Sequence, residues 1–232
     1  EVTKYLLAKG VDLGESLNSM DKTEGTEEIR SLLKNSMVGR QMLICFWCLG
    51  PVNSEFSISC IQITDSPYVA HSEALLYRPG YEQFKKVGAN REFFKFLHSQ
   101  GELDTNGCSK NVPLKRIYID LEENIVYSTN TQYAGNTVGL KKLALRLAIQ
   151  KASREGWLAE HMFVMGVHGP NGRVTYFNGA FPSACGKTST AMIPGQTIVG
   201  DDIAYLRKSG GKVYTANVEQ GIFGIIENVN PK

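Results

Sequence analysis

The sequence has no long apolar run, and this absence excludes a class of protein. None of its hydrophobic stretches approaches the roughly 18 residues that a membrane-spanning helix needs. The first ten residues, EVTKYLLAKG, also lack the hydrophobic region of a secretory signal. We therefore expect a cytoplasmic protein with no membrane partner.

Charge of one sign is not in excess either. The 25 Lys and Arg residues are nearly balanced by 23 Asp and Glu residues, and both kinds are scattered along the chain. A nucleic-acid-binding domain usually concentrates basic residues on one face, so we expect no nucleic-acid partner. With 232 residues, 42% of them hydrophobic, the chain can bury a core as one large domain or two small ones.

Cysteines are few, and their number is odd. The five residues Cys45, Cys48, Cys60, Cys108 and Cys185 are unevenly spaced, which argues against a disulfide framework. Cys45 and Cys48 form a CxxC pair, but they lie in the strand-like run QMLICFWCLG, where positions three apart point to opposite faces. Because there is no second pair, we expect free thiols, with a zinc or redox role as the alternative.

The first part of the chain predicts a mixture of strands and helices. The polar first 35 or so residues contain a helix near their end, in TEGTEEIRSLLKN. Two strand-like runs follow, QMLICFWCLG and EFSISCIQITD, joined by the turn-prone PVNS. We expect a short helix in REFFKFLHSQ and a hairpin in KRIYIDLEENIVYST with its turn at EEN.

The second part begins with a long helix and continues in strands. The helix is expected from about Thr137 to Glu155, ending at Gly156, and strands and loops then alternate through HMFVMGVH, GRVTYFNGAF, QTIVGDDIAYL and GKVYTANV. No internal repeat is present. The pattern predicts an α/β fold with a mixed-sheet N-terminal region, residues 1–160, followed by part of a nucleotide-binding domain, residues 161–232.

The stretch FPSACGKTST, residues 181–190, resembles a phosphate-binding loop. Such a loop needs backbone N–H groups around the phosphates, a lysine that reaches the outer phosphate oxygens and a hydroxyl for Mg²⁺, and Gly186, Lys187 and Thr188 supply these parts. The usual first glycine is missing, because Phe181 stands there. An ordinary loop or helix start is therefore the alternative.

Two adjacent acids follow the loop. Asp201 and Asp202 come at the end of the apolar run in TIVGDDIAYL, which we expect to be a buried strand. Because Mg²⁺ and Mn²⁺ prefer carboxylate oxygens, such a pair suits a metal-assisted phosphoryl transfer, although a solvated turn could also carry two acids. The loop and the acid pair support each other.

These motifs resemble the GTP-dependent phosphoenolpyruvate carboxykinases. FPSACGKT and VGDDIAYL are similar to the nucleotide loop and the metal-binding strand end of that family, and IQITDSPYVAHS, YAGNTVGLKKLALR and EGWLAEHM match earlier segments in the same order. The matches span about residues 38 to 226. The cysteine in the loop distinguishes this family from the ATP-dependent carboxykinases.

The resemblance implies a reversible reaction in which oxaloacetate loses CO₂ and takes a phosphoryl group from GTP, giving phosphoenolpyruvate and GDP. It also implies two cofactor ions, a catalytic Mn²⁺ and a Mg²⁺ that accompanies the nucleotide. The physical demands agree, since the enolate oxygen formed as CO₂ leaves and the transferring phosphoryl group both need positive charge nearby. The family is mostly monomeric, and the oligomeric state of this chain is left open.

The resemblance implies that Mn²⁺ is held by Lys141, His161 and Asp202. Counting back from His161 gives Lys141, whereas counting forward from Tyr133 gives Lys142, because the chain is one residue shorter than the family in between. Helical phase favours Lys141. The helix positions that share its face are all apolar: Ala144, Leu145, Ala148, Ile149 and Ala152. A lysine whose amine snorkels to water is the alternative, and His161 alone would suit a structural role.

The resemblance also implies the remaining site residues. Thr188 would bind the nucleotide's Mg²⁺ beside Asp201, and Lys187 would bridge the phosphates. Nucleotide contacts would come from the loop residues Ser183, Ala184, Cys185, Gly186, Lys187, Thr188 and Ser189, and substrate contacts from Tyr133, Gly135 and Ser183.

Cys185 and Lys187 are the residues that the resemblance implies to be catalytic. A thiol beside a lysine and a metal is expected to have a lowered pKa. A small apolar packing role is the alternative for Cys185.

Several parts of the family pattern are missing from the sequence, including the lid, the guanine pocket and an N-terminal substrate-binding arginine. We therefore expect a fragment of a larger enzyme with little or no turnover. A non-catalytic nucleotide- or metal-binding module is the alternative, and an ATP- or pyrophosphate-using relative is a third possibility.

Overall fold

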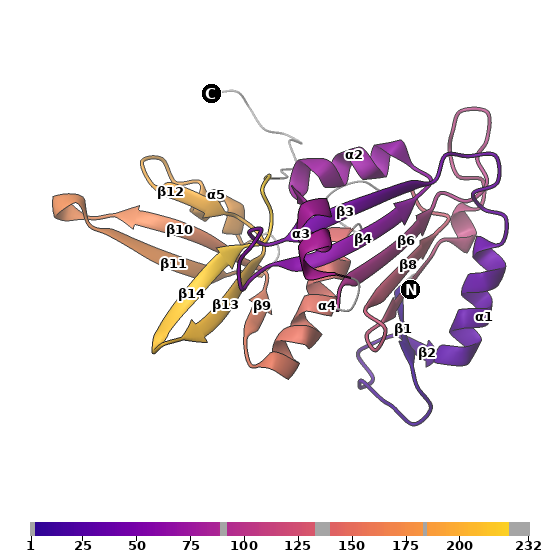
Figure 1. The fold of residues 1–232 in the computed structure, drawn as a ribbon, viewed down its shortest axis with the longest axis horizontal. Coiled ribbons are helices and arrows are strands. Elements are labelled where there is room, and N and C mark those ends of the chain that lie inside the picture. Colours follow the sequence, from indigo (N-terminus) through magenta and orange to yellow (C-terminus); the bar gives the residue numbers. More distant parts are fainter. Residues whose placement is uncertain (1–2, 89–91, 133–139, 183–184, 223–232) are drawn as a thin grey trace.

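The computed structural model describes residues 3–88, 92–132, 140–182 and 185–222. These residues form one large mixed sheet with helices on it, and beside it two small antiparallel sheets (Figure 1). The large sheet belongs to the first two thirds of the chain, and the small sheets to the last third. The predicted α/β fold with a mixed-sheet N-terminal region is confirmed.

The large sheet has eight strands in the order β2-β1-β7-β8-β6-β4-β3-β5. Their bounds are β1 Thr3–Leu7, β2 Ser19–Asp21, β3 Leu43–Leu49, β4 Ile58–Thr64, β5 Arg78–Pro79, β6 Phe94–Ser99, β7 Arg116–Asp120 and β8 Ile125–Thr129. The neighbours β4, β6 and β8 run parallel, whereas β3–β4 and β7–β8 are antiparallel hairpins. The carboxyl ends of β4, β6 and β8 therefore meet at one edge, which is where α/β folds commonly place polar sites.

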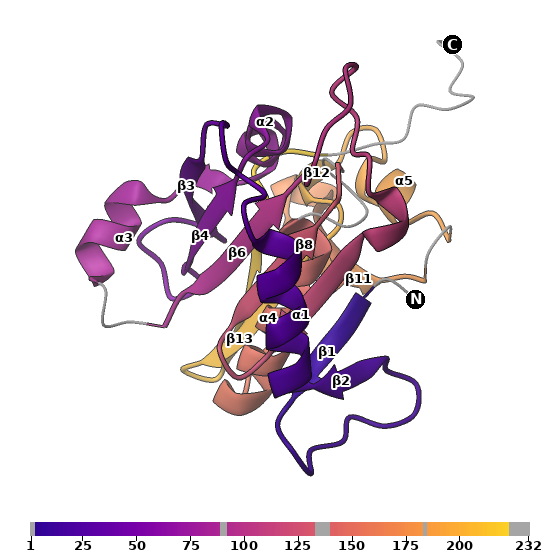
Figure 2. The same ribbon diagram turned by 90° about the vertical axis from the view of Figure 1, so that its right-hand side faces the viewer.

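Helices cover both faces of this sheet. They are α1 Lys22–Leu33, α2 Pro67–Leu76, α3 Tyr81–Val87 and α4 Leu140–Glu155, with a short 3₁₀ turn at Val112–Leu114. Ile117 and Ile119 on β7 join the main core, to which α4 contributes its apolar side, whereas Tyr118 between them packs with Ile29 of α1. Figure 2 shows α1 in front of the sheet and α4 behind it. The alternation along β7 thus holds a helix on each face.

The last third of the chain forms two three-stranded sheets. β9 Leu158–Glu160, β13 Ala204–Ser209 and β14 Lys212–Asn217 form one, in the order β14-β13-β9. β10 Met162–His168, β11 Val174–Ala180 and β12 Thr197–Gly200 form the other, in the order β11-β10-β12. A 3₁₀ turn, Pro170–Gly172, joins β10 to β11, and helix α5 Lys187–Ala191 follows β11.

Most sequence predictions of secondary structure are confirmed. The helix near the end of the first 35 residues is α1, the two strand-like runs joined by PVNS are β3 and β4, the predicted hairpin is β7–β8, and α4 ends at Glu155. Gly156 stops it with φ of 73°, a left-handed conformation that glycine adopts at little cost. The sequence analysis did not predict α2, α3, β1 or β2.

Two predictions were wrong. The expected helix in REFFKFLHSQ is strand β6, in which Phe94, Phe96 and His98 are buried while Lys95 and Leu97 are only half-buried. This period of two fits a central strand, and pairing with β4 and β8 overrides the local helix signal. The run before Asp201 is a strand, β12, but it is not buried, since its first three residues are exposed.

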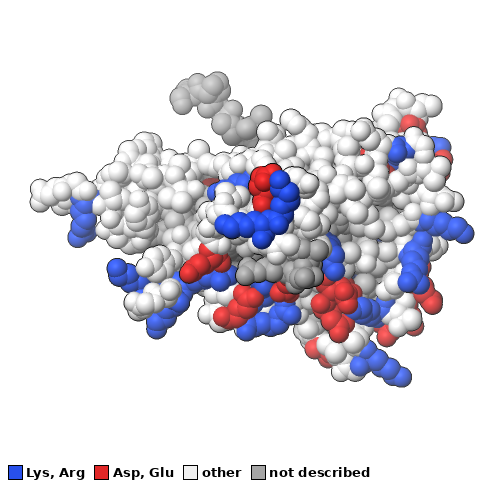
Figure 3. All heavy atoms as spheres, viewed as in Figure 1, with Lys and Arg blue, Asp and Glu red and all other residues white. Residues whose placement is uncertain are grey.

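The surface matches the balanced composition. In Figure 3, basic and acidic side chains are interspersed on the face shown, without a large area of one sign. Among the described residues, no helix is long and apolar enough to cross a membrane.

Candidate functional site

The predicted metal ligands come together where the large sheet's helix α4 meets the small sheets. Lys141 lies in the first turn of α4, His161 between β9 and β10, and Asp202 between β12 and β13. Lys141 Nζ is 2.6 Å from Asp202 Oδ2, and His161 Nδ1 is 3.5 Å from Asp202 Oδ1. One carboxylate thus faces a nitrogen of each of the other two residues.

Helical phase predicted that Lys141 faces inward and Lys142 outward, and the structure confirms this orientation. Lys141 is only 1% exposed, whereas Lys142 is exposed. The neighbours of Lys141 on the same face include the buried Ala144, Leu145 and Ala148 of the main core. Whether Lys141 ligates a metal stays a prediction.

The phosphate-loop residues lie against the same acids. Gly186 has φ of 87° directly before α5, and Lys187 is the first residue of that helix. Lys187 Nζ is 3.0 Å from the backbone oxygen of Asp202 and also contacts Asp202 Oδ1. Thr188 Oγ1 donates a hydrogen bond to Asp201 Oδ2 at 2.9 Å. The loop lysine and hydroxyl therefore face the acid pair, as the strand–loop–helix arrangement requires.

The other predicted residues are placed only in part. Cys185 and Ser189 are exposed. Tyr133, Gly135, Ser183 and Ala184 lie outside the described residues.

The structure adds a residue that the sequence analysis missed. Glu219, just after β14, is 1% exposed, and its Oε1 is 3.2 Å from Lys141 Nζ. Lys141 thus lies between two carboxylates, those of Asp202 and Glu219. No motif in the sequence pointed to this position, because it follows an ordinary strand and lies far from Lys141 along the chain.

These contacts shift the pKa values of the buried groups. Burial alone would lower the pKa of Lys141, but the carboxylates of Glu219 and Asp202 outweigh it and raise that pKa. Burial would also raise the pKa of Asp202, but His161, Lys141 and Lys187 hold it well below its usual range. Burial raises the pKa of Glu219 to about 7, against the opposing effect of Lys141. Asp202 is therefore held as a carboxylate by its cationic neighbours.

The chemistry of this donor set fits a divalent ion such as Mn²⁺. Imidazole nitrogen and carboxylate oxygen both suit such ions, and an amine nitrogen can serve once it has lost its proton. Among the described residues, no group of three or more His, Cys, Asp or Glu side chains could hold a metal. The predicted metal set therefore depends on Lys141 as a ligand. The buried Cys48 and half-buried Cys45 belong to no such group.

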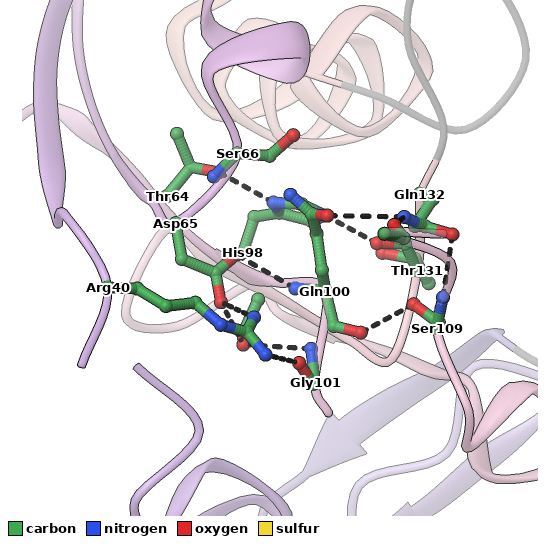
Figure 4. Close-up of polar contacts among 12 residues, drawn as sticks. Arg40, Thr64, Asp65, Ser66, His98, Gln100, Gly101, Ser109, Thr131 and Gln132 are labelled. Atoms are coloured by element: carbon green, nitrogen blue, oxygen red, sulfur yellow. Dashed lines mark hydrogen bonds and ion pairs between the residues drawn. The ribbon is translucent and has the colours of Figure 1, made fainter. Parts of the chain in front are cut away.

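A second polar centre lies at the carboxyl ends of β4, β6 and β8 (Figure 4). Asp65 accepts hydrogen bonds from Arg40 Nη1 at 2.9 Å, Ser99 Oγ at 2.7 Å and the backbone N–H of Gln100 at 2.9 Å. Arg40 also donates to the carbonyl oxygen of Gly101. These contacts join the segment before β3 to the ends of β4 and β6.

His98 forms the other half of this centre. Its Nε2 is 3.0 Å from the carbonyl oxygen of Thr131, and its Nδ1 is 2.7 Å from Thr64 Oγ1. Since a carbonyl only accepts, Nε2 carries the proton and Nδ1 accepts from the threonine hydroxyl. Burial lowers the pKa of His98, so the ring is held neutral between β4 and the end of β8.

The fold and the site together define an α/β protein in which the lysine and threonine of a Gly-Lys-Thr loop lie against two adjacent aspartates. Residues 1–153 match the family model described as the phosphoenolpyruvate carboxykinase N-terminal domain, and residues 157–232 match that of the phosphoenolpyruvate carboxykinase C-terminal P-loop domain. The chain therefore belongs to the phosphoenolpyruvate carboxykinase family, which confirms the resemblance.

Curated relatives carry the same family name. The chain is 60% identical to the phosphoenolpyruvate carboxykinase [GTP] of Pyrococcus horikoshii over 230 residues, which are 99% of this chain and 37% of that protein. It is 49% identical to the enzyme so named in Saccharolobus solfataricus over 93% of this chain and 34% of that protein, and 40% identical to the one in Chlamydia caviae over 100% and 41%. The chain thus spans about 37% of the length of the first of these relatives.

Proposed function

We propose that this chain carries the metal-binding and phosphate-binding part of a GTP-dependent phosphoenolpyruvate carboxykinase. The reaction is the reversible conversion of oxaloacetate and GTP to phosphoenolpyruvate, CO₂ and GDP. One observation carries the proposal: Lys141, His161 and the loop lysine Lys187 converge on Asp202, although they come from four separate segments of the chain. The names of the relatives support the choice of reaction and of nucleotide.

The residues of this chain would take different parts in the reaction, according to where they lie in the site. Lys187 would leave Asp202 to bind the phosphate oxygens of the nucleotide, and the Thr188 hydroxyl, now on Asp201, would face the ion that accompanies it. Lys141, His161 and Asp202 would hold the other ion. Bound divalent ions would supply positive charge that offsets the negative charge developed as CO₂ leaves and the phosphoryl group moves.

Several finer statements stay predictions. Mn²⁺ as the catalytic ion, Mg²⁺ with the nucleotide and a part in gluconeogenesis or anaplerosis follow from the family resemblance alone. The substrate roles of Tyr133, Gly135 and Ser183 and the reactivity of Cys185 have the same basis. The domain boundary near residue 160 and a cytoplasmic location also stay predictions, and they rest on the change in sequence pattern and on the lack of long apolar runs. We expect the 232-residue chain to bind Mn²⁺.

A calorimetric titration of Mn²⁺ into the 232-residue chain tests the metal site. We expect one bound ion, and we expect His161→Ala and Asp202→Ala each to abolish binding, because each removes a ligand of a three-residue set. His71→Ala is the matched control, since His71 is exposed on α2. An ion that binds equally well to all four proteins would show that the site lies elsewhere.

The loop is tested with GDP in the same way. We expect Lys187→Ala to weaken GDP binding in the presence of Mg²⁺, whereas replacement of the exposed Lys208 on β13 should leave it unchanged. Equal GDP affinity of the two variants would contradict the assignment of the loop.

A further inference from the structure

Glu219 is a buried acid that has no part in the family pattern described above. Its Oε1 lies 3.2 Å from Lys141 Nζ, and the same nitrogen is 2.6 Å from Asp202 Oδ2. Both Lys141 and Glu219 are 1% exposed. A buried charged pair of this kind is costly to desolvate, so its retention needs either good packing or a role in the site.

The backbone around Glu219 is held by hydrogen bonds to the end of α2 and the start of β5. Arg78, at the start of β5, donates from Nη1 to the carbonyl oxygen of Val218 at 2.8 Å and from Nη2 to that of Glu219 at 3.2 Å. The next residue, Gln220, donates from its backbone N–H to Leu76 O at 2.7 Å and from its side chain to Tyr77 O at 2.8 Å. The segment after β14 is thus hydrogen-bonded to the end of α2, and these bonds fix the backbone that carries the Glu219 side chain.

The chemistry of an amine ligand gives this carboxylate a task. A neutral lysine amine has one lone pair and two N–H groups, and only the lone pair can bind a metal. The N–H groups then need acceptors, because a buried donor without a partner is destabilising. Asp202 can give one oxygen to the metal and accept one N–H with the other, so the second N–H needs a further acceptor, and Glu219 Oε1 lies 3.2 Å from the nitrogen.

We propose that Glu219 is a positioning residue that holds the Lys141 amine in place for a divalent cation. The inference rests on the proposed function, since it takes Lys141, His161 and Asp202 as the ligands. In this proposal Glu219 contacts neither the ion nor the substrate, and it orients the metal ligand Lys141 by accepting a hydrogen bond from its amine. Groups with this task typically change metal affinity by about 10–100-fold when they are replaced.

Mn²⁺ affinity of Glu219→Gln is the first measurement. The substitution keeps the size of the side chain and removes its charge, and we expect binding about 10–100-fold weaker than in the unaltered chain. Glu219→Asp keeps the charge but shortens the side chain by one methylene, and we expect an intermediate loss of Mn²⁺ affinity. Glu92→Gln is the control. Glu92 pairs at 2.8 Å with Lys151, which lies on α4 as Lys141 does but away from the site. The Mn²⁺ affinity of this variant should not change.

Electron spin-echo spectroscopy of bound Mn²⁺ separates positioning from mere structural support. With ¹⁵N-labelled lysine, the unaltered chain should show coupling between the ion and a lysine nitrogen. In Glu219→Gln, under Mn²⁺ saturation, this coupling should weaken or vanish while the histidine coupling remains. A residue that only stabilised the fold would leave both couplings intact in the folded protein.

The outcomes keep the two proposals apart. If the unaltered chain binds Mn²⁺ and both Glu219 variants bind it equally well with the lysine coupling retained, the inference on Glu219 is overturned and the metal site stands. If the unaltered chain binds no Mn²⁺, the metal site itself is wrong and the inference falls with it. If Glu219→Gln does not fold, Glu219→Asp decides, since wild-type affinity in that variant would contradict the proposal.

Discussion

Two aspartates, Asp65 and Asp202, each lie among basic and polar groups, but they differ in exposure and in the number of basic side chains around them. The Asp65 side chain is 0% exposed and has one cation, Arg40, with two neutral donors. The Asp202 side chain is 19% exposed and faces two lysines and a histidine. Asp65 is therefore enclosed with Arg40 as its ion partner, whereas Asp202 is partly open and contacts Lys141 and Lys187, of which Lys141 also faces Glu219.

These differences in exposure and charge suit the two centres to different tasks. A buried network in which every group has its partner stabilises one arrangement and offers no group to a ligand. A partly open carboxylate shared by several cations can give one of them up to a phosphate at little cost. We expect substitutions at the Asp65 centre to act on stability, and those at the Asp202 centre to act on binding.

The largest expected effect is on folding stability at the first centre. Asp65→Asn removes the charge that Arg40 and two further donors face, and breaking a buried pair of this kind costs about 3–5 kcal/mol in the free energy of unfolding. Urea denaturation measures it. Glu82→Gln, which breaks only the exposed pair with Lys85, should leave the free energy of unfolding nearly unchanged. A loss at Asp65 as small as that of the control would show that the network adds little.

The second prediction concerns binding at the other centre. Lys187 contacts the Asp202 carboxylate that the divalent ion would need, so Lys187→Gln removes a competing positive charge. We expect Mn²⁺ to bind about tenfold more tightly in the absence of nucleotide, a gain of about 1.4 kcal/mol. Calorimetry on this variant, with Lys208→Gln as the exposed control, measures the change. Weaker Mn²⁺ binding would mean that Lys187 supports the ion rather than competes with it.

The third and smallest effect is the pH dependence of stability at the Asp65 centre. Burial lowers the pKa of His98, with opposing effects from the Thr131 carbonyl and Asp65, so below about pH 6.5 the unfolded chain binds a proton that the folded chain excludes. Stability should therefore be unaffected by His98 above that pH and should fall as the pH drops below it, by up to about 1.4 kcal/mol per pH unit.

Urea denaturation between pH 7.5 and 5.5 checks this sign. His98→Asn should flatten the dependence, whereas His71→Asn, at an exposed position of α2, should leave it as in the unaltered chain. An unchanged slope in His98→Asn would assign the acid sensitivity to other groups.

Much of the fold could be predicted because its signals are local. The period of α4 is carried by neighbouring residues, and it placed Lys141 inward before any tertiary contact was known. The failure at β6 has the opposite cause. Three phenylalanines and a leucine in REFFKFLHSQ suit a helix as well as a strand, and only the neighbours β4 and β8 decide between them. Exposure of β12 likewise depends on which elements cover it.

The candidate site was predictable only where a motif marks it. Lys187, Thr188 and Asp202 stand in recognisable segments, so the sequence identified them. Glu219 stands in none, and its contact with Lys141 exists because the end of β14 is tied to α2 through Arg78 and Gln220. Asp65 and His98 were missed for a similar reason, since their partners come from different strands.

Helical period and loop chemistry depend on residues close together in the chain, so the sequence was enough to predict the α/β class, the inward face of α4 and the phosphate loop. The three-dimensional structure was needed to show that β6 is a strand, that the groups around Asp65 pair with one another and that Glu219 contacts Lys141. Such contacts depend on strand pairing and on which chain segments meet in space, and no short stretch of sequence encodes either.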